Sequence, residues 1–228
     1  MKISGLQKLT LLDYPEKTAA TVFFSGCNLR CPFCHNADLV LTAGEGDIDE
    51  SEVLGYLKKR VGILDGVCIT GGEPLLQKDL EDFIKKIKDL GYKVKLDTNG
   101  TFPDKLSHLL SLSLLDYVAM DVKNAPEKYC ETSGAQVDCD KILSSIDILK
   151  NSGIDHEFRT TLVSQFHTPE DVAKIAKILG GSEKYFLQKF VDSHRLICDG
   201  LSALSDEIMQ KCLKEAQKYV PLAQLRGM

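Results

Sequence analysis

Strand-like and helix-like segments alternate along most of this chain of 228 residues. The strand-like segments are short runs rich in β-branched and aromatic residues, and the segments between them carry apolar residues at helical spacing. Such alternation predicts a parallel sheet with right-handed crossovers. We therefore expect an α/β fold whose parallel strands form an incomplete (β/α)6 barrel, smaller than the eight-stranded form of ~250 residues. The expected strands cover residues 19–25, 66–70, 93–98, 117–122, 157–163 and 184–190.

The clearest helical pattern lies between the second and third expected strands. Its apolar residues share one face, and Gly91 follows as a stop signal. Further helices are expected over residues 140–151, over residues 169–179 and from Ser205 onward. No internal repeat or Pro/Ser-rich linker interrupts the sequence, so we expect residues 1–228 to form a single domain. The residues of the clearest pattern are Leu76, Leu80, Phe83, Ile84, Ile87 and Leu90.

Polar motifs follow four successive expected strands. The carboxyl ends of the strands in a parallel barrel share one rim, and active sites lie at that rim. We therefore expect the four motifs to converge on one site. In chain order they are a cysteine-rich loop over residues 26–36, Gly71-Gly72-Glu73-Pro74, Asp97-Thr98-Asn99-Gly100 and Asp121-Val122-Lys123.

The charge balance limits the partners of this chain. Twenty-eight Lys and Arg residues against thirty-three Asp and Glu residues give a net charge of −5. A chain this acidic, without a basic cluster, does not fit binding to nucleic acid through phosphate contacts. No apolar run approaches the ~20 residues of a membrane span, and the first ten residues lack the apolar core of a secretory signal. We therefore expect a cytoplasmic protein with reduced thiols and with neither nucleic acid nor a membrane as partner.

Three cysteines of the loop have the spacing C-x3-C-x2-C, at Cys27, Cys31 and Cys34. Structural zinc is normally held by four Cys or His ligands, and His35 is poorly placed to complete a tetrahedron with its neighbour Cys34. An iron–sulfur cube held by three cysteines keeps one iron open for a further ligand. The spacing therefore favours a [4Fe–4S] cluster. Incidental cysteines or a zinc site remain the alternative reading.

The loop sequence Gly26-Cys-Asn-Leu-Arg-Cys-Pro-Phe-Cys-His-Asn36 resembles the signature of radical S-adenosylmethionine (SAM) enzymes. Its Cys-His-Asn ending resembles the activases of glycyl radical enzymes, and most of all the activating proteins of anaerobic ribonucleoside-triphosphate reductase. Residues 9–15, 120–126 and 225–227 support this resemblance, which covers essentially the whole chain. It implies a radical-SAM-type barrel with a [4Fe–4S] cluster and SAM. In this family an electron from the cluster breaks a sulfonium–carbon bond of SAM, which gives a 5′-deoxyadenosyl radical.

The resemblance also implies roles for single residues. Gly71 and Gly72 allow a close backbone approach to a ligand, and Glu73 suits the amino group of SAM. Lys123 resembles a lysine that faces the methionine carboxylate. Ordinary turns, surface lysines and core packing are the structural alternatives at these positions. Further cofactor contacts are expected from Phe33, His35, Asn36, Asp97, Asp121, Arg159, Leu187 and Phe190, and a monovalent cation is expected near Asp97, Thr98 and Asp121.

The expected function is activation of a glycyl radical enzyme, with anaerobic ribonucleotide reductase as the partner and flavodoxin or ferredoxin as the electron donor. Two alternatives stay open: a radical SAM enzyme that acts on another glycyl radical enzyme or a small molecule, and a non-catalytic iron–sulfur or zinc module. The other cysteines show no compact ferredoxin-type spacing, so a second cluster is not favoured. They are Cys68, Cys130, Cys139, Cys198 and Cys212.

Overall fold

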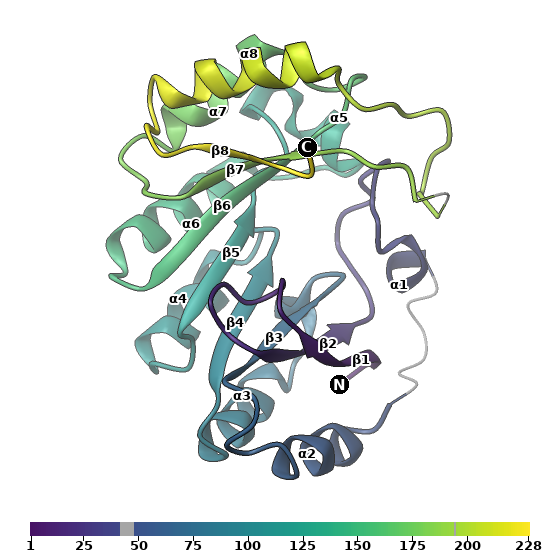
Figure 1. Cartoon of the computed structure of the whole chain (residues 1–228), viewed down its shortest axis with the longest axis vertical. Helices are drawn as coiled ribbons and strands as arrows, with labels where there is room; N and C mark the ends of the chain where they lie inside the picture. The colour runs from purple at the N-terminus through teal and green to yellow at the C-terminus, as the bar shows by residue number, and fades with distance from the viewer. Residues whose placement is uncertain (42–47, 194) are drawn as a thin grey trace. The chain divides into compact units, whose positions relative to one another are not determined.

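The computed structural model describes residues 1–41, 48–193 and 195–228, and the chain forms two compact units. Unit 1 contains residues 1–28, 38–98 and 104–118, and unit 2 contains residues 29–37, 99–103 and 119–228. Figure 1 shows the order of helices and strands along the chain. The cysteine-rich loop is divided between the units, because Cys27 belongs to unit 1 whereas Cys31 and Cys34 belong to unit 2.

Unit 1 is built around parallel strands. Strand β2 runs antiparallel to β1 and parallel to β3, and β3 runs parallel to β4. β2 and β3 are apolar and buried along most of their length, as expected for parallel strands covered on both faces. The elements are β1 (Ile3–Thr10), β2 (Ala19–Phe24), α1 (Ala37–Leu41), α2 (Glu50–Lys58), β3 (Gly66–Gly71), a 3-10 turn at Pro74–Leu76, α3 (Leu80–Asp89), β4 (Lys93–Thr98) and α4 (Pro103–Ser111).

Helix α3 packs with the apolar face that the sequence predicts. Leu80, Phe83, Ile84 and Ile87 are buried, and the rings of Phe83 and Phe24 meet edge-on with 5.9 Å between their centroids. The helix begins later than predicted, because Pro74 starts a short 3-10 turn in front of it.

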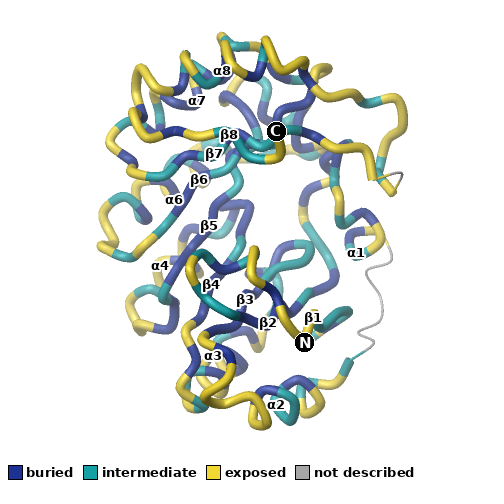
Figure 2. The backbone as a smooth tube through the Cα atoms, in the orientation of Figure 1, coloured by how far each residue is buried: buried dark blue, intermediate teal, exposed yellow. Residues whose placement is uncertain are grey.

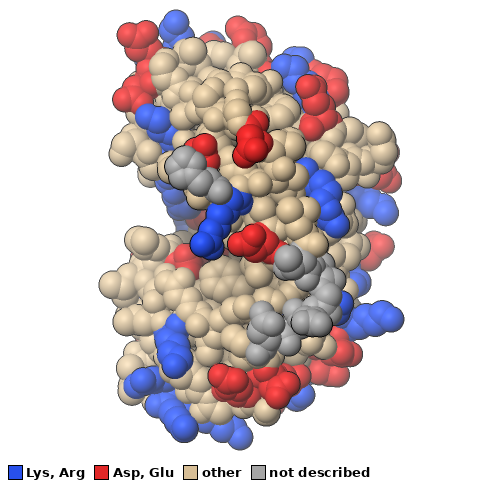
Figure 3. All heavy atoms as spheres, turned by 90° about the vertical axis from the view of Figure 1, so that its right-hand side faces the viewer, with Lys and Arg blue, Asp and Glu red and all other residues tan. Residues whose placement is uncertain are grey.

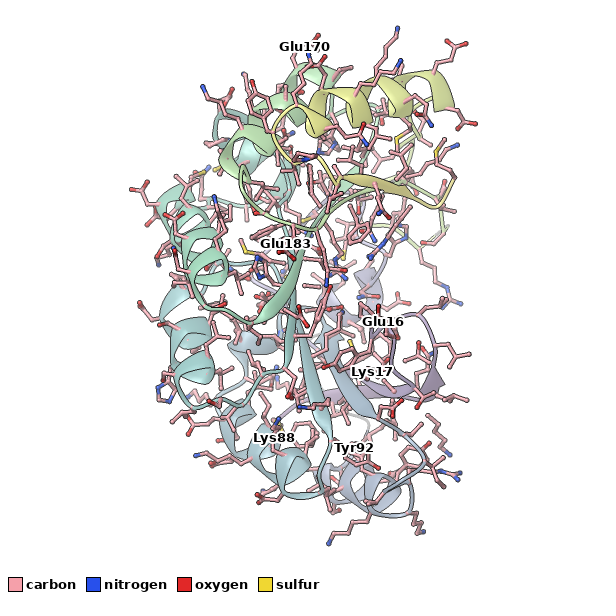
Figure 4. The ribbon with its side chains drawn as sticks, turned by 60° about the vertical axis from the view of Figure 1, so that its left-hand side comes forward. Glu16, Lys17, Lys88, Tyr92, Glu170 and Glu183 are labelled. Carbon is pink, nitrogen blue, oxygen red and sulfur yellow. The ribbon has the colours of Figure 1, made fainter. Side chains whose placement is uncertain are left out.

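Two polar contacts fix the helices of unit 1 to its strands, and Figure 4 labels one residue from each. The buried hydroxyl of Tyr92, just before β4, donates to the backbone oxygen of Leu57 at 2.7 Å. Lys88, in α3, donates to the carboxylate of Asp116 at 2.6 Å. Helices α2 and α3 are thereby held at the amino ends of the strands.

Strand β5 (Tyr117–Asp121) begins in unit 1 and ends in unit 2. At its start, the backbone of Asp116 donates to Val94 in β4 at 2.8 Å. At its end, the backbone of Val122 donates to Arg159 in β6 at 2.9 Å. The strands accordingly follow one another from β1 to β8 in sheet order, and the sheet is not closed.

Unit 2 continues the alternation. Strands β6, β7 and β8 are parallel, and helices α7 and α8 pack side by side (Figure 1). A capping box in which Thr168 and Asp171 bond each other's backbone starts α7, with Pro169 as its first residue. The elements are a 3-10 turn at Pro126–Lys128, α5 (Tyr129–Ser133), α6 (Cys139–Asn151), β6 (Asp155–Leu162), α7 (Pro169–Ile178), β7 (Tyr185–Lys189), α8 (Asp206–Gln217) and β8 (Gln224–Arg226).

The exposed faces of the helices and the mixed charges of the surface agree with the nearly balanced numbers of acidic and basic residues. Figure 2 shows helices that are buried on one side and exposed on the other, such as α8, which buries Met209, Cys212 and Ala216. On the face drawn in Figure 3, side chains of both charge signs are interspersed. In the described part of the chain, no helix is both long enough and apolar enough to cross a membrane.

The parallel α/β prediction is confirmed, and each predicted strand lies within two residues of the observed one. Strands β1 and β8 and helices α1, α2, α4 and α5 were not predicted from the sequence. Strand β1 carries Gly5 and an exposed polar stretch, and β8 has 3 residues. In both strands the pattern of apolar residues is too weak or too short to be recognised from the sequence alone.

Gly134 is predicted to be indispensable where the cysteine-rich loop meets α5. It has φ of 63°, and a Cβ atom there would lie 2.1 Å from the backbone oxygen of Arg30. Gly134→Ala should therefore lower the stability by about 2 kcal/mol or more, or roughly 4–8 °C in Tm, since the strained backbone and the clash add together. Thermal unfolding of the apoprotein measures this loss.

Gly153→Ala is the matched control. Gly153 has φ of 70°, but nothing lies within 4 Å of a Cβ atom there. This variant should lose only the ~1 kcal/mol that a left-handed alanine costs. Equal losses in the two variants would contradict the close packing of the loop on α5.

Candidate active site

The part of the cysteine-rich loop that lies in unit 2 is held by backbone hydrogen bonds. The Cys34 amide donates to the Cys31 oxygen at 3.0 Å, which folds the C-x2-C segment into a turn. The Arg30 amide donates to Ser133 at 2.9 Å, and the Cys198 amide donates to Pro32 at 3.0 Å. Two separate segments of unit 2 thus fix the positions of two predicted cluster ligands.

The thiols of this turn are mostly shielded from water. Cys31 is buried and Cys34 is half-buried. Burial raises the pKa of the Cys34 thiol, while the Asn36 amide and the positive charge of Lys123 act in the opposite direction. Because metals bind the thiolate, cluster binding would release a proton here.

Cys27 and the Gly-Gly-Glu motif come together in unit 1. The Glu73 amide donates to the oxygen of Gly26 at 2.8 Å, directly beside Cys27. A Cβ atom on Gly72 would lie 2.0 Å from that same oxygen, and one on Gly71 would lie 2.3 Å from the oxygen of Phe24. The two glycines therefore let the end of β3 pack on the end of β2.

Glu73 is fully buried, and its carboxylate accepts hydrogen bonds from a backbone amide and a hydroxyl group. Its Oε1 atom accepts from the Leu75 amide at 3.1 Å and from the Thr98 hydroxyl at 2.9 Å. Thr98 ends β4 and is also buried. The carboxylate is thus a fixed acceptor inside unit 1, which suits the ammonium group that the sequence analysis assigns to it.

Asp97 has a partner for each carboxylate oxygen. Lys95 forms an ion pair with Oδ1, and the Thr70 hydroxyl donates to Oδ2 at 3.1 Å. Lys95 is only 1% exposed, and its ammonium also lies 3.8 Å from the Cys68 sulfur. The expected cofactor residue Asp97 is therefore held by a buried cation of the same strand.

Asp121, Lys123 and Arg159 form one charged cluster in unit 2. Arg159 Nε donates to Asp121 Oδ1 at 2.8 Å, and Lys123 Nζ donates to Oδ2 at 3.0 Å. Burial alone would raise the pKa of Asp121, but the charges of Arg159 and Lys123 hold it far below its ordinary value. Burial alone would lower the pKa of Lys123, but Asp121 keeps it above its ordinary value. All three groups are thus charged at neutral pH.

A second ion pair supports Arg159. Glu157, also in β6, has a side chain that is 2% exposed, and its Oε1 atom lies 4.0 Å from Nη1 of Arg159. It accepts two hydrogen bonds from Arg226 of β8, at 2.9 and 3.0 Å. The Arg226 guanidinium lies 3.3 Å from the ring centroid of Phe186. In the sequence, Arg226 contributes to the family resemblance, and no role was predicted for it.

His167 is a supporting residue that the sequence analysis missed. Its Nε2 atom lies 2.8 Å from the backbone oxygen of Lys123, and Nδ1 accepts from the Val163 amide at 3.1 Å. Its ring meets that of Phe33 edge-on at 6.4 Å. Val163 is only four residues away, but Lys123 is distant in the chain, so the sequence gives no signal for this second contact.

The aromatic and apolar candidates of unit 2 differ in exposure. Phe33 is buried, with its ring 6.0 Å from that of Phe166. His35 is exposed and lies 5.9 Å from the ring of Phe190. Leu187 is fully buried inside β7. Phe190, just after β7, is also buried, whereas Phe33 and His35 belong to the cysteine-rich loop itself.

A family model decides the assignment of the chain. The model described as the radical SAM superfamily matches residues 21–179, which are well over half of the sequence. The chain belongs to the radical SAM superfamily. Membership implies SAM and a [4Fe–4S] cluster as cofactors and makes the protein a radical SAM enzyme. The predicted fold, with parallel strands in a sheet that is not closed, is confirmed.

Individual relatives agree with this assignment. A protein of Methanocaldococcus jannaschii, provisionally named a glycyl-radical enzyme activating enzyme, is 35% identical over 96% of this chain and 92% of its own length. The pyruvate formate-lyase-activating enzyme of Clostridium pasteurianum is 30% identical over 78% of this chain and 76% of its own. The structure of Streptococcus suis SuiB bound to S-adenosylmethionine has a TM-score of 0.71 at 13% identity, covering 91% of this chain and 52% of that chain, which shows the fold alone.

The three thiols of the loop are the donor type that an iron–sulfur cluster takes. None of Cys27, Cys31 and Cys34 forms a disulfide, and the backbone bonds described above fix each motif segment within its unit. Within residues 1–41, 48–193 and 195–228, no group of three His, Cys, Asp or Glu side chains is arranged to hold a metal ion. The cysteines are divided between the two units, so their assignment to the cluster rests on the motif and the family.

Thr98→Val is predicted to destabilise the protein by about 1.5–3 kcal/mol. The buried carboxylate of Glu73 would lose a hydrogen bond at 2.9 Å with almost no change in shape. Denaturant unfolding of the apoprotein measures the loss. Thr161→Val serves as the control, because the Thr161 hydroxyl lies 3.4 Å from the neutral amide oxygen of Gln188, and it should cost less than about 1 kcal/mol. A reversed order of the two losses would refute the support of Glu73.

His167 is predicted to make stability depend on pH below about 6.5. Burial lowers the pKa of His167 in the folded protein, so the unfolded chain binds the proton first as the pH falls. Stability is then lost from about pH 6.5 downward, by up to about 2 kcal/mol at pH 5. His167→Gln should show a shallower loss between pH 7 and 5 and the same slope as wild type between pH 7 and 8. Parallel curves over the whole range would contradict this assignment.

Proposed function

We propose that this enzyme activates a glycyl radical enzyme. The observation that carries the proposal is the 35% identity to the Methanocaldococcus jannaschii activating enzyme over nearly the full length of both chains. The match to the pyruvate formate-lyase-activating enzyme supports it. Relatives named for small-molecule reactions match less fully: two 7-carboxy-7-deazaguanine synthases match 54% and 46% of this chain, and a GTP 3′,8-cyclase of Aquifex aeolicus matches 75% of this chain but 56% of its own length, at 29% identity. Activation of a protein partner is therefore favoured over a small-molecule reaction.

The chemistry of the proposal comes from the two cofactors. When bound, the reduced [4Fe–4S] cluster and SAM supply a 5′-deoxyadenosyl radical, which takes a hydrogen atom from a glycine of the partner and leaves a glycyl radical there. The protein binds, orients and shields these groups. Cys27, Cys31 and Cys34 would hold the cluster.

The charged groups of the chain would bind the methionine part of SAM. Lys123, kept charged by Asp121, would attract the carboxylate, and Arg159 would add a second cation. Glu73 is a fixed acceptor for the amino group. Asp97, with both oxygens oriented, would accept from the ribose or the amino end. Orientation of these groups before binding lowers the cost of ordering them with the ligand.

The apolar groups would bind the adenosine part. Phe33, packed against Phe166, would lie beside the adenine and exclude water from it. His35 and Asn36 follow the third cysteine and would contact the cofactor from the same loop, while Leu187 and Phe190 would contribute from β7 and its end. We further propose that anaerobic ribonucleotide reductase is the partner, that flavodoxin or ferredoxin donates the electron, and that the reaction takes place in the cytoplasm.

The decisive experiment is anaerobic electron paramagnetic resonance. The reconstituted, reduced protein is mixed with SAM and the anaerobic ribonucleotide reductase of the same organism, and a glycyl-radical doublet on the reductase is expected. Cys31→Ala should abolish both cluster content and doublet, because a cluster ligand is lost. Cys139→Ala, a half-buried cysteine outside the motif, should retain both.

Other outcomes separate the remaining candidates. A doublet on pyruvate formate-lyase but not on the reductase would favour the second partner, which the relative from Clostridium pasteurianum suggests. Release of 5′-deoxyadenosine without a doublet on either protein would exclude both partners and leave a radical SAM enzyme with a different substrate. Full cluster content in Cys31→Ala would overturn the ligand assignment.

A further inference from the structure

Lys95 is a lysine in an unusual place, since lysine is almost never fully buried without a partner. It lies in the middle of β4 and is 1% exposed. In the strand register, Lys95 is opposite Cys68 of β3, which is opposite Thr21 of β2. Cys68 and Thr21 carry no negative charge, whereas Asp97 does. The charge of Lys95 is therefore directed at Asp97, two residues further along the same face of β4.

Asp97 is one of the residues at which a monovalent cation was expected. Its Oδ1 atom pairs with the Lys95 ammonium, and its Oδ2 atom accepts from the Thr70 hydroxyl at 3.1 Å. Oxygen atoms that suit a hard cation are thus already engaged by an ammonium and a hydroxyl of unit 1. A free ion at Asp97 would have to displace an ammonium that is buried and cannot reach water instead.

Asp121, in unit 2, was also expected to bind the ion, and its carboxylate oxygens are likewise paired with cationic side chains. Its oxygens receive Arg159 at 2.8 Å and Lys123 at 3.0 Å. Each of the two carboxylates is therefore neutralised by cations of the chain itself. This donor set does not fit a free monovalent ion.

We propose that Lys95 is a built-in cation that takes the place of a monovalent ion at Asp97. It is a positioning residue: its ammonium fixes the Asp97 carboxylate in the orientation that accepts SAM, so SAM binding by this enzyme needs no sodium or potassium. This inference rests on the proposed role of Asp97 in SAM binding. It does not depend on which molecule the radical attacks.

The experiment compares SAM binding to the reconstituted holoenzyme in three buffers of equal ionic strength. The salts are potassium chloride, sodium chloride and tetramethylammonium chloride, the last of which is too large to bind between carboxylate oxygens. Wild type should bind SAM with the same Kd, within twofold, in all three. Lys95→Met should bind at least tenfold more weakly in tetramethylammonium chloride, and potassium or sodium should restore binding, because the uncompensated carboxylate now requires an ion.

Sodium-23 NMR relaxation on the apoprotein gives a readout that is independent of the cluster and of activity. Lys95→Met should show saturable sodium binding, and wild type should not. The double variant Lys95→Met/Asp97→Asn should lose that sodium binding, because the carboxylate charge is removed together with the lysine. Lys93→Met is the matched control on the same strand, since Lys93 is exposed and pairs with Asp116 at 2.9 Å, and it should behave as wild type.

Two results would overturn the proposal: a wild-type Kd that rises tenfold when sodium and potassium are withdrawn, or a folded Lys95→Met protein whose Kd for SAM is unchanged in all three salts. If Lys95→Met does not fold, Lys95→Gln replaces it, and the wild-type comparison alone still tests the claim. Failure of the glycyl-radical assay with normal SAM binding would reject the proposed partner and leave the role of Lys95 intact.

Discussion

Ion pairs removed from water are the interaction on which the site depends. A buried charge is tolerated only when an opposite charge and hydrogen bonds replace its hydration. Within the described residues, Lys95 and Asp97 meet this condition, with side chains that are 2% and 16% exposed. The pairs of Asp121 with Lys123 and Arg159, and of Glu157 with Arg226, are part-buried, since Asp121 is 32% and Arg226 is 37% exposed. Each pair joins groups on strands or directly after them, so the Asp97 carboxylate within unit 1 and the Asp121 carboxylate within unit 2 are each oriented before a ligand binds.

The backbone at the strand ends imposes the second constraint. The Gly-Gly-Glu motif follows β3, and its glycines have no side chain because the oxygens of Phe24 and Gly26 lie within 2.3 Å of where a Cβ atom would be. This close packing places the amide of Glu73 on Gly26, next to Cys27. The motif resembles a ligand-binding turn in the sequence, and in the structure it also packs the end of β3 against the end of β2. The same close packing holds Glu73 in place.

The sequence was most informative where a signal is local. Buried parallel strands are continuous apolar runs, so their positions could be predicted to within two residues. The cysteine motif favours an iron–sulfur cluster, and its resemblance to a family signature adds SAM. Strands β1 and β8 were not predicted, because each lies at an edge of the sheet with only one neighbouring strand and its pattern of apolar residues is weak. The contacts of Lys95 with Cys68, of Glu157 with Arg226 and of His167 with Lys123 could not be predicted either, because they join segments far apart in the chain. Asp97 lies only two residues from Lys95, but the sequence does not show that Lys95 is buried.

A tethered ammonium and a free ion are not equivalent ways to neutralise a carboxylate. A free ion must be bound from solution, so the fraction of protein that carries it follows the salt concentration. The ammonium of Lys95 is attached to the strand that carries Asp97, and its effective concentration there does not depend on the medium. The cost is that its charge and position are fixed by the β4 backbone, whereas an ion can adjust to the ligand. An enzyme that orients one cofactor in one way has little use for that adjustment, which is the physical reason to expect a lysine at this position.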